Sequence, residues 1–406
     1  MTKEVDVVVI GAGPAGSVAS SKLIKEGLNV LVLEKMQFPR FVIGESLLPH
    51  SMDYLDELGL LPSVEALKFQ VKTGACFYHN GERCDFLFEN QFTEGWSYTF
   101  QVKRADFDYA LIKETEKQGA EVEFQAEVTD VKTSSTKQVV TYRDKNGDIH
   151  EVHCRYVMDA SGYGRVLPQM FDLEVPVSTP PRGAVFAHLD DTRRTPEDGR
   201  NIFVHAFNDN KAWIWSIPFS DGTASVGIVG DKAFVDECYA DGGKLFKQKV
   251  AEFPGLNGRY DGVEFMFEPR TIVNYAVSVK QVYGEGYVLC GNSTEFLDPI
   301  FSSGVTLAIS SGYKAAALVA RQLNGGQVDW ETEYSAVLKK GIDVFRTYVL
   351  AWYEGTLGDI FFSEKVDETI RQQICSVLAG YVWDESNPFV KKHSTLVNAV
   401  AHIVKM

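Results

Sequence analysis

The sequence predicts an α/β fold, and three observations along the chain support this prediction. An apolar strand at residues 5–10 leads through a glycine-rich turn at 11–16 into a helix of small residues. Residues 182–280 carry mostly strand-like segments, as expected for an antiparallel sheet inserted into the first domain. A strand, a turn and a helix at 286–322 then resume the opening pattern. The last part, 331–406, reads as a helical segment rich in aromatic residues, which we expect to close one side of a substrate cavity.

The opening turn, Gly-Ala-Gly-Pro-Ala-Gly, has the spacing of a dinucleotide-binding turn. Gly11 permits the tight turn, Gly13 lets the backbone approach a pyrophosphate, and Gly16 lets the helix lie on the sheet. The helix N-terminus presents free N–H groups and a partial positive charge to the phosphates. Such a turn is weak evidence alone, since glycine-rich turns also arise for steric reasons.

The second half of the fingerprint is an acidic residue after the next strand. Residues 29–33 form this apolar strand, and Glu34 ends it. The Glu34 carboxylate can accept hydrogen bonds from a ribose hydroxyl, and it would repel a 2′-phosphate. Together, the turn and Glu34 predict a dinucleotide cofactor without a 2′-phosphate.

The composition is that of an ordinary globular protein. Of the 406 residues, 45% are hydrophobic and 23% are charged, with a net charge of −15 that disfavours nucleic acid as a partner. No apolar run approaches the length of a spanning helix, and the chain enters a strand without a basic leader, so we expect a cytoplasmic protein without stable membrane insertion. The six cysteines and eight histidines lack ligand spacing, which predicts free thiols and no metal site.

Between these landmarks the pattern predicts further elements. Strands cluster at 74–88 and 96–103, a helix follows at 105–118, and a β-meander with a turn at 145–148 occupies 121–158. The strands expected in the inserted sheet are 183–189, 201–207, 211–218 and 223–230.

Several motifs in this order resemble the FAD-dependent monooxygenase superfamily, which shares its fold with para-hydroxybenzoate hydroxylase, flavin-dependent halogenases and geranylgeranyl reductases. The resemblance extends from residue 5 to about 320. The motifs are GAGPAG at 11–16, Glu34, Arg40 with Gly44-Glu45-Ser46, Arg104 before Ala105-Asp106-Phe107-Asp108, Asp159-Ala160-Ser161-Gly162, and Asp298-Pro299.

The resemblance implies a Rossmann-like domain that binds FAD. Arg104 and Glu34 would help to hold the ADP part, and Asp298 would accept a hydrogen bond from the ribityl chain. The amides of Gly304 and Val305 would face the pyrimidine edge of the flavin at a positive helix end. The full set of cofactor-binding candidates is Gly11, Gly13, Ala15, Gly16, Glu34, Lys35, Arg40, Glu45, Ser46, Arg104, Asp159, Gly162, Asp298, Pro299, Ser303, Gly304 and Val305.

The implied domains are discontinuous. The FAD-binding domain would comprise 1–73, 104–170 and 281–325, and the substrate domain 74–103 with 171–280. Residues 326–406 would form the helical C-terminal segment.

The segment Trp213-Ile214-Trp215-Ser216-Ile217-Pro218 resembles the WxWxIP pattern of flavin-dependent halogenases. In those enzymes the two tryptophans stand near the flavin and keep the substrate away from it, while hypohalous acid travels to a lysine. A purely structural reading is also open, because Trp213, Trp215 and Ile217 share one face of a strand and suit a core. A related strand in geranylgeranyl reductases means that the motif marks a branch of the superfamily.

For the lysine, Lys72 is the candidate, because it stands just before Gly74 at the opening of the substrate sheet, as in phenol and pyrrole halogenases. Lys68 is the second choice. Most lysines lie on solvated surfaces, which is the competing reading. The pattern of tryptophan halogenases is not evident around Glu295, whereas residues 301–304 resemble the phenol and pyrrole branch.

The function expected is therefore halogenation or oxygenation of a small aromatic substrate of the phenol or pyrrole type, with reduced FAD and O₂. The expected partner is a small aromatic or apolar molecule, free or tethered to a carrier. A separate flavin reductase is the expected source of reduced FAD, since no second GxGxxG fingerprint is present for a nicotinamide cofactor. The alternatives are a geranylgeranyl reductase-like flavoprotein, an aromatic hydroxylase, and a catalytically silent FAD-binding protein.

Overall fold

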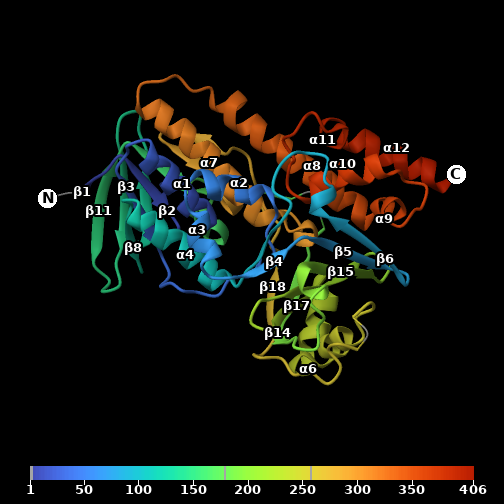
Figure 1. The fold of residues 1–406 in the computed structure, drawn as a ribbon. Helices are drawn as coiled ribbons and strands as arrows, with labels where there is room; N and C mark the ends of the chain where they lie inside the picture. The colour runs from blue at the N-terminus through green and yellow to red at the C-terminus, as the bar shows by residue number, and fades with distance from the viewer. Residues whose placement is uncertain (1–2, 178–179, 257) are drawn as a thin grey trace.

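A computed structural model describes residues 3–177, 180–256 and 258–406. Two large sheets and a group of helices from the end of the chain make up the molecule (Figure 1). The first sheet and its helices lie beside the second sheet, and the helical tail packs against both (Figure 1). The predicted α/β class is confirmed.

The first large sheet has six strands, five of them parallel, and β2 lies near its centre. Its order is β20 (Tyr283–Gly284), β21 (Tyr287–Leu289), β12 (Tyr156–Asp159), β2 (Val7–Ile10), β3 (Val30–Glu34) and β8 (Glu121–Phe124). One face carries the helices α1 (Pro14–Lys25), α4 (Arg104–Lys117) and α7 (Ser303–Leu323). The continuous apolar strands predicted at the start of the chain are thus buried on both faces.

A four-stranded sheet covers the other face of this layer. Its order is β1 (Lys3–Glu4), β11 (Ile149–Cys154), β10 (Gln138–Arg143) and β9 (Glu127–Lys132). The predicted meander is correct here in part. The segment 121–131 divides at Gln125, whose φ of 57° breaks the strand, so that β8 joins the large sheet and β9 the small one. Residues 149–158 divide in the same way at Arg155, between β11 and β12.

The second large sheet has seven strands and contains the four strands predicted for the inserted sheet. Its order is β18 (Arg270–Val273), β14 (Gly183–Asp190), β17 (Thr223–Gly230), β16 (Ala212–Pro218), β15 (Asn201–Phe207), β5 (Gly74–His79) and β6 (Glu82–Leu87). Helix α6 (Lys232–Ala251) covers one face, and the other face looks toward the first large sheet. Two short ribbons complete the strands: β4 (Gln70–Lys72) with β7 (Thr99–Gln101), and β13 (Glu174–Val175) with β19 (Ser278–Val279).

The tail is helical, as predicted, and is drawn in orange and red in Figure 1. Its helices are α8 (Ala336–Tyr353), α9 (Thr356–Phe361), α10 (Glu368–Leu378), α11 (Pro388–Lys391) and α12 (His393–Lys405). Phe361 and Trp352 pack their rings against Phe77 of β5, at centroid distances of 5.1 and 5.4 Å. The remaining helices are α2 (His50–Glu57), α3 (Leu61–Glu65) and α5 (Val166–Met170). Among the described residues, no helix has the length and apolar character needed to cross a bilayer.

Candidate cofactor and substrate site

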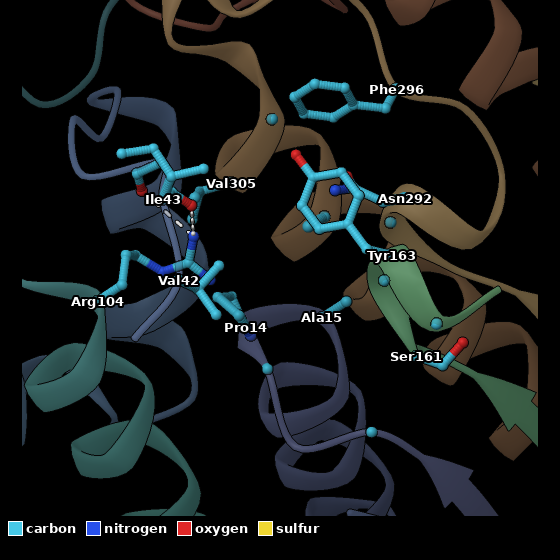
Figure 2. Close-up of a pocket in the computed structure, with 18 of the residues that line it drawn as sticks. Pro14, Ala15, Val42, Ile43, Arg104, Ser161, Tyr163, Asn292, Phe296 and Val305 are labelled. Carbon is cyan, nitrogen blue, oxygen red and sulfur yellow. Dashed lines mark hydrogen bonds between the residues drawn. The ribbon is translucent and has the colours of Figure 1, made fainter. Parts of the chain in front are cut away.

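A cavity of about 520 Å³ lies between the two large sheets. Glu34 and Val128 line one end of it, beside the carboxyl ends of β3 and the start of β9. Trp213 and Trp215, from the second large sheet, line the other end. Figure 2 shows part of the cavity, with the start of α1 below and the start of α7 behind Val305. Ligands in open α/β sheets bind outside the carboxyl ends of the strands, where this cavity lies.

The glycine turn has the geometry that its sequence predicts. Gly11 has a φ of +98°, and a Cβ atom there would lie 2.6 Å from the carbonyl oxygen of Ala160. A Cβ at Gly16 would lie 1.9 Å from the Gly11 oxygen, so Gly16 serves the packing of α1 and does not line the cavity. Gly13 and Ala15 do line it. The turn therefore leaves its backbone open to a ligand at the N-terminus of α1.

Glu34 lies at the cavity wall and is buried, with 7% of its surface exposed. Its Oε2 accepts a hydrogen bond of 2.9 Å from the Ala12 amide, and its Oε1 accepts one of 2.8 Å from the Met36 amide. Each carboxylate oxygen has a second lone pair, so both can accept from a hydroxyl as well. Lys35 also lines the cavity and pairs with Glu127 at 2.7 Å.

Two arginines face the glycine turn and share one buried carboxylate. Arg40 donates to Asp108 at 2.8 Å, and Arg104 binds the same carboxylate through two bonds of 2.8 and 2.9 Å. Arg40 Nη2 would lie 3.6 Å from a Cβ on Gly13. Both arginines line the cavity, and Arg104 also donates to the Ile43 carbonyl at 3.1 Å (Figure 2). Two guanidinium groups beside a helix N-terminus suit a diphosphate.

Two predicted aspartates are not at the cavity wall. Asp159 is fully buried and accepts hydrogen bonds from the Ser161 amide (2.8 Å), the Leu167 amide (2.7 Å) and the Ser293 hydroxyl (2.9 Å). It therefore shapes the turn after β12, and Gly162 in that turn lines the cavity.

Asp298 is also behind the wall, where its carboxylate accepts hydrogen bonds from Tyr275 and Tyr353 at 2.8 Å each. Burial raises the pKa of Asp298, and the two tyrosine hydroxyls oppose that shift. The ribityl contact implied for this residue has no support in the geometry, because Asp298 does not line the cavity.

The start of α7 contributes backbone to the cavity. Pro299, Gly304 and Val305 line it, whereas the buried Ser303 does not. Ser302 precedes the helix with a φ of 57°, which turns the chain so that the first amides of α7 meet the cavity. A helix N-terminus at this point stabilises negative charge on a bound group.

The tryptophan strand forms one wall, as the alternation predicts. Trp213, Trp215 and Ile217 of β16 line the cavity, and the two indole rings lie 5.7 Å apart at 47°. Trp215 lies over Gly227 of β17, where a Cβ would come within 2.2 Å of the ring, and it donates to the Ser225 hydroxyl at 3.2 Å. The tryptophans are buried, as expected for core residues, and they also line the cavity, so the two interpretations of this strand are compatible.

Lys72 lies behind the wall, next to the segment that carries Glu45 and Ser46. It is 1% exposed and does not line the cavity, although Glu45 and Ser46 do. Its Nζ donates to the Leu47 carbonyl at 2.8 Å and lies 5.4 Å from the centre of the Phe88 ring. Burial lowers the pKa of the Lys72 amine to about 7. An amine with this pKa is partly neutral at physiological pH.

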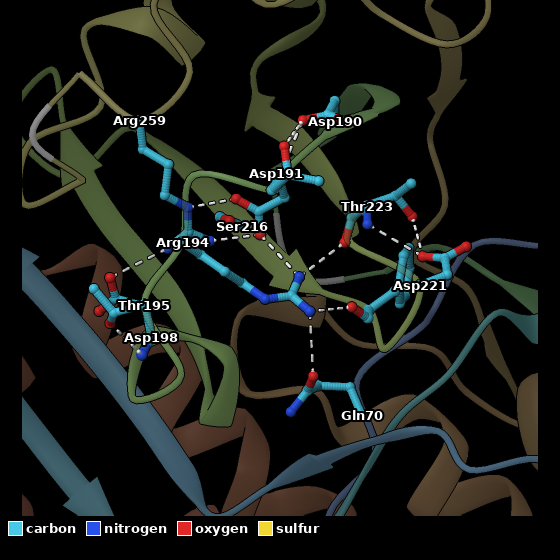
Figure 3. A network of polar contacts seen from close by, with 12 residues as sticks. Gln70, Asp190, Asp191, Arg194, Thr195, Asp198, Ser216, Asp221, Thr223 and Arg259 are labelled. Carbon is cyan, nitrogen blue, oxygen red and sulfur yellow. Dashed lines mark hydrogen bonds and ion pairs between the residues drawn. The ribbon is translucent and has the colours of Figure 1, made fainter.

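The strand that carries Lys72 is tied to the second large sheet by the network in Figure 3. Arg194 contacts Gln70 of β4 at 3.4 Å and Asp191 at 3.2 Å. Asp191 in turn accepts two hydrogen bonds from Arg259, at 2.5 and 2.7 Å. Burial raises the pKa of Asp191, and the two guanidinium groups oppose that shift. The network holds β4 in place two residues before the amine.

Several residues of the site are not among those that the sequence predicts. Asn292, Tyr163 and Phe296 line the cavity (Figure 2), and Asn292 could have been suspected from its place just after the returning strand. Asp108 could have been found from its i,i+4 spacing to Arg104. The sequence predicts that the helical tail closes one side of a substrate cavity, but no described residue beyond Ala308 lines the cavity between the two sheets.

These residues fit FAD. A glycine turn open to the cavity, two arginines and a helix N-terminus suit the diphosphate, and a buried carboxylate at Glu34 suits a ribose. Aromatic rings and the start of α7 enclose the opposite end, where a flat ring system would lie. Among the residues that the structure describes, no group of three or more His, Cys, Asp or Glu side chains has the arrangement of a metal site.

Comparison with known proteins agrees with this fit. A model of the FAD binding domain family matches residues 4–335. A chlorinase of 1H-pyrrole-2-carbonyl peptidyl-carrier protein from Pseudomonas fluorescens is 28% identical, over 93% of this chain and 89% of the relative. The corresponding brominase from Pseudoalteromonas luteoviolacea is 30% identical, over 82% of this chain and 81% of the relative. A flavoprotein/dehydrogenase from Cytophaga hutchinsonii, of known crystal structure, is 47% identical, with a TM-score of 0.96 over 100% of this chain and 99% of that one.

Proposed function

Because this chain belongs to the FAD binding domain family, on a branch with flavin-dependent halogenases, we propose that it halogenates a small aromatic substrate of the phenol or pyrrole type. The protein is an FAD-dependent oxidoreductase of the halogenase-like kind, and FAD is its cofactor. The observation that carries the proposal is the wall of Trp213 and Trp215 on the cavity, with the buried Lys72 amine behind Ser46. Substrate would be kept from the flavin by the two indole rings.

Reduced FAD, when bound, would supply two electrons and two protons which, with one further proton, convert O₂ and a halide ion into hypohalous acid and water. Arg40, Arg104 and the amides of Gly13 and Ala15 would hold its diphosphate, and Glu34 its ribose. Gly304 and Val305 would place the helix end of α7 at the flavin.

Lys72 would receive the hypohalous acid. Its neutral form has a lone pair that can accept the halogen, with the N–H proton and the hydroxide leaving together as water. The halogen then passes to an aromatic carbon, and the ring proton leaves as the amine N–H is restored. The low pKa of Lys72, caused by burial, favours the neutral amine that this step needs.

We propose that polar side chains near Lys72 provide the route by which hypohalous acid reaches its amine. Thr99 pairs with Lys72 across the ribbon of β4 and β7, and Ser46 bridges to Gln101 of the same strand. Within the described part of the chain, the Ser46 and Thr99 hydroxyls and both polar atoms of the Gln101 amide are buried without a protein partner. Buried polar atoms normally bind water when no protein partner is available. Ser46 links this group to the cavity.

We further propose that a separate flavin reductase supplies the reduced FAD and that the substrate is free or carried by a carrier protein. The two pyrrole halogenases compared above act on carrier-bound substrates, which supports the second option. Rapid reduction of the bound flavin when NADPH alone is added to the purified protein would contradict the need for a separate reductase.

The test is turnover by purified protein with FAD, a flavin reductase, NADH, O₂ and bromide or chloride. Free phenols, free pyrroles and carrier-bound pyrrole are offered, and mass spectrometry reports halogen incorporation. We expect a halogenated product that Lys72→Ala abolishes while FAD stays bound. Lys68→Ala is the matched control, because Lys68 is exposed and should retain full activity. Halogenation by the Lys72→Ala variant would remove this residue from the mechanism.

A second candidate is a flavin-dependent dehydrogenase or a double-bond reductase. The 47% identical flavoprotein/dehydrogenase supports it. Such an enzyme would transfer a hydride between substrate and flavin and would need no halide and no lysine. Substrate oxidation or reduction that proceeds equally well without halide, and equally well in Lys72→Ala, would favour this candidate.

A further inference from the structure

One buried carboxylate lies behind two aromatic residues of the cavity wall. Asp298 Oδ2 accepts a hydrogen bond from the Tyr275 hydroxyl and another from the Tyr353 hydroxyl, both at 2.8 Å. Tyr275 lines the cavity directly. Tyr353 does not line it, but its oxygen accepts the indole N–H of Trp213 at 2.9 Å. The four side chains form a single chain of hydrogen bonds from one wall residue to the other.

The chain of bonds has a fixed direction. The Trp213 N–H can only donate, so the Tyr353 oxygen accepts from it and donates its own proton to Asp298. Burial raises the pKa of Tyr353 well above its ordinary value, so its hydroxyl stays protonated. The Ile300 amide donates to the other oxygen of Asp298 at 3.2 Å and holds the carboxylate in place. The Arg182 guanidinium lies 3.6 Å from the centre of the Tyr353 ring and fixes that ring from outside.

Tyr353 is the last residue of α8, so the bonds join the helical tail to the tryptophan strand. The tail is thus bonded to a residue of the cavity wall, although no described residue of the tail lines the cavity itself. On the other side, Tyr275 meets Phe296 edge to face at 5.8 Å, and Phe296 also lines the cavity. The rings at the flavin end of the cavity are therefore held from behind through Asp298.

We propose that Tyr353 and Asp298 are positioning residues that set the orientation of Trp213 and Tyr275 in the cavity wall. This inference rests on the proposed function for its consequence, which is that the wall keeps reduced FAD from being oxidised without product. Without the Tyr353 oxygen, the Trp213 N–H would be buried without a partner, and the ring would shift to recover one. Reduced FAD would then react with O₂ to release hydrogen peroxide in place of product.

The first test reads the position of Trp213 without any turnover. Protein labelled with ¹⁵N on its six indole groups shows one N–H resonance for each, and Trp213→Phe identifies the signal of that residue. We expect Tyr353→Phe to shift this signal and to leave those of the other indoles in place. Tyr348→Phe is the matched control, since Tyr348 lies on the same helix with a buried hydroxyl that has no partner among the described residues.

An unchanged Trp213 signal in Tyr353→Phe, or an equal shift in Tyr348→Phe, would overturn the inference. Should Tyr353→Phe fold poorly, Asp298→Asn is a second variant, in which the new side chain has nearly the size of the old one. It should shift the same Trp213 signal.

The second test measures hydrogen peroxide released for each reduced FAD consumed, with FAD binding checked by its absorption. We expect the hydrogen peroxide released to rise severalfold in Tyr353→Phe and not to rise in Tyr348→Phe. An equal release in the two variants would contradict the proposed role of Tyr353 in positioning the cavity wall. If the wild-type protein forms no halogenated product, the proposed function fails, while the indole shift still decides the positioning role.

Discussion

Glu45 and His188 meet at a hydrogen bond of 2.8 Å between Oε1 and Nε2. Glu45 belongs to the segment at the cavity wall, whereas His188 belongs to β14 of the second large sheet. Both are buried, and Oε2 of Glu45 has no partner among the described residues. The imidazole therefore ties a cavity residue to the sheet that carries the tryptophans.

Removal of the His188 imidazole should lower both the stability of the protein and its affinity for FAD. His188→Ala leaves the buried Glu45 carboxylate unpaired, which costs about 1–3 kcal/mol of unfolding free energy. We expect a lower midpoint in urea unfolding and a larger dissociation constant for FAD. His188→Gln, which keeps a donor at a similar position, should recover much of both. If His188→Ala matches the wild type in both measurements, the hydrogen bond between Glu45 and His188 contributes neither to stability nor to FAD binding.

The carboxylate shared by Arg40 and Arg104 predicts a cofactor-dependent effect. Asp108→Ala leaves two guanidinium groups beside each other with no counter-charge, at a cost of about 3–5 kcal/mol. The diphosphate of FAD would supply negative charge at the same place. We therefore expect FAD to raise the melting temperature of Asp108→Ala more than that of the wild type. Asp106→Ala, on the exposed face of the same helix, is the control and should respond to FAD like the wild type.

The buried amine of Lys72 predicts a pH-dependent stability. Burial lowers its pKa from 10.5 to about 7, so the folded state binds fewer protons than the unfolded state between these values. The resulting destabilisation is complete below pH 7 and disappears as the pH rises toward 10.5. Lys72→Met removes this destabilisation, which amounts to about 1.4 kcal/mol for a pKa difference of one between the two states. Urea unfolding at pH 6.5 should show the variant to be more stable, with the gain shrinking at pH 9.5. A gain of the same size at both values would contradict this assignment.

The fit of Trp215 over Gly227 predicts a steric effect. A methyl group at Gly227 would overlap the indole, and the overpacking should cost about 1–3 kcal/mol. We expect Gly227→Ala to lower the melting temperature and to alter the quenching of flavin fluorescence on binding. Gly358→Ala is the control, because no atom lies within 4 Å of a Cβ there. Its stability should be unchanged or higher, since alanine favours a helix over glycine.

The parts of the site that depend on local sequence could be predicted. The glycine turn, the end of β3 at Glu34 and the shared face of Trp213 and Trp215 follow from spacing and alternation. All three lie where the sequence places them. The strand break at Gln125 could not be predicted, because alternation alone does not indicate which of two sheets a strand joins.

Roles that depend on distant partners could not be predicted. Asp298 is a candidate from the resemblance alone, and Tyr275 and Tyr353 bind its carboxylate from positions 23 and 55 residues away. The depth of Lys72 depends in the same way on Leu47 and Phe88, which no spacing around the lysine indicates. These contacts arise only when the two sheets and the tail come together.

The burial of Lys72 also limits which reagents can react with its amine. Acylating or pyridoxylating reagents in bulk solvent would label the exposed lysines of the surface and leave this one unmodified, because the residue is 1% exposed. Selective labelling of Lys72 by a small compound that enters from the cavity would support the proposed role of this amine. The same seclusion would spare the rest of the protein from a reactive halogen once it is bound there.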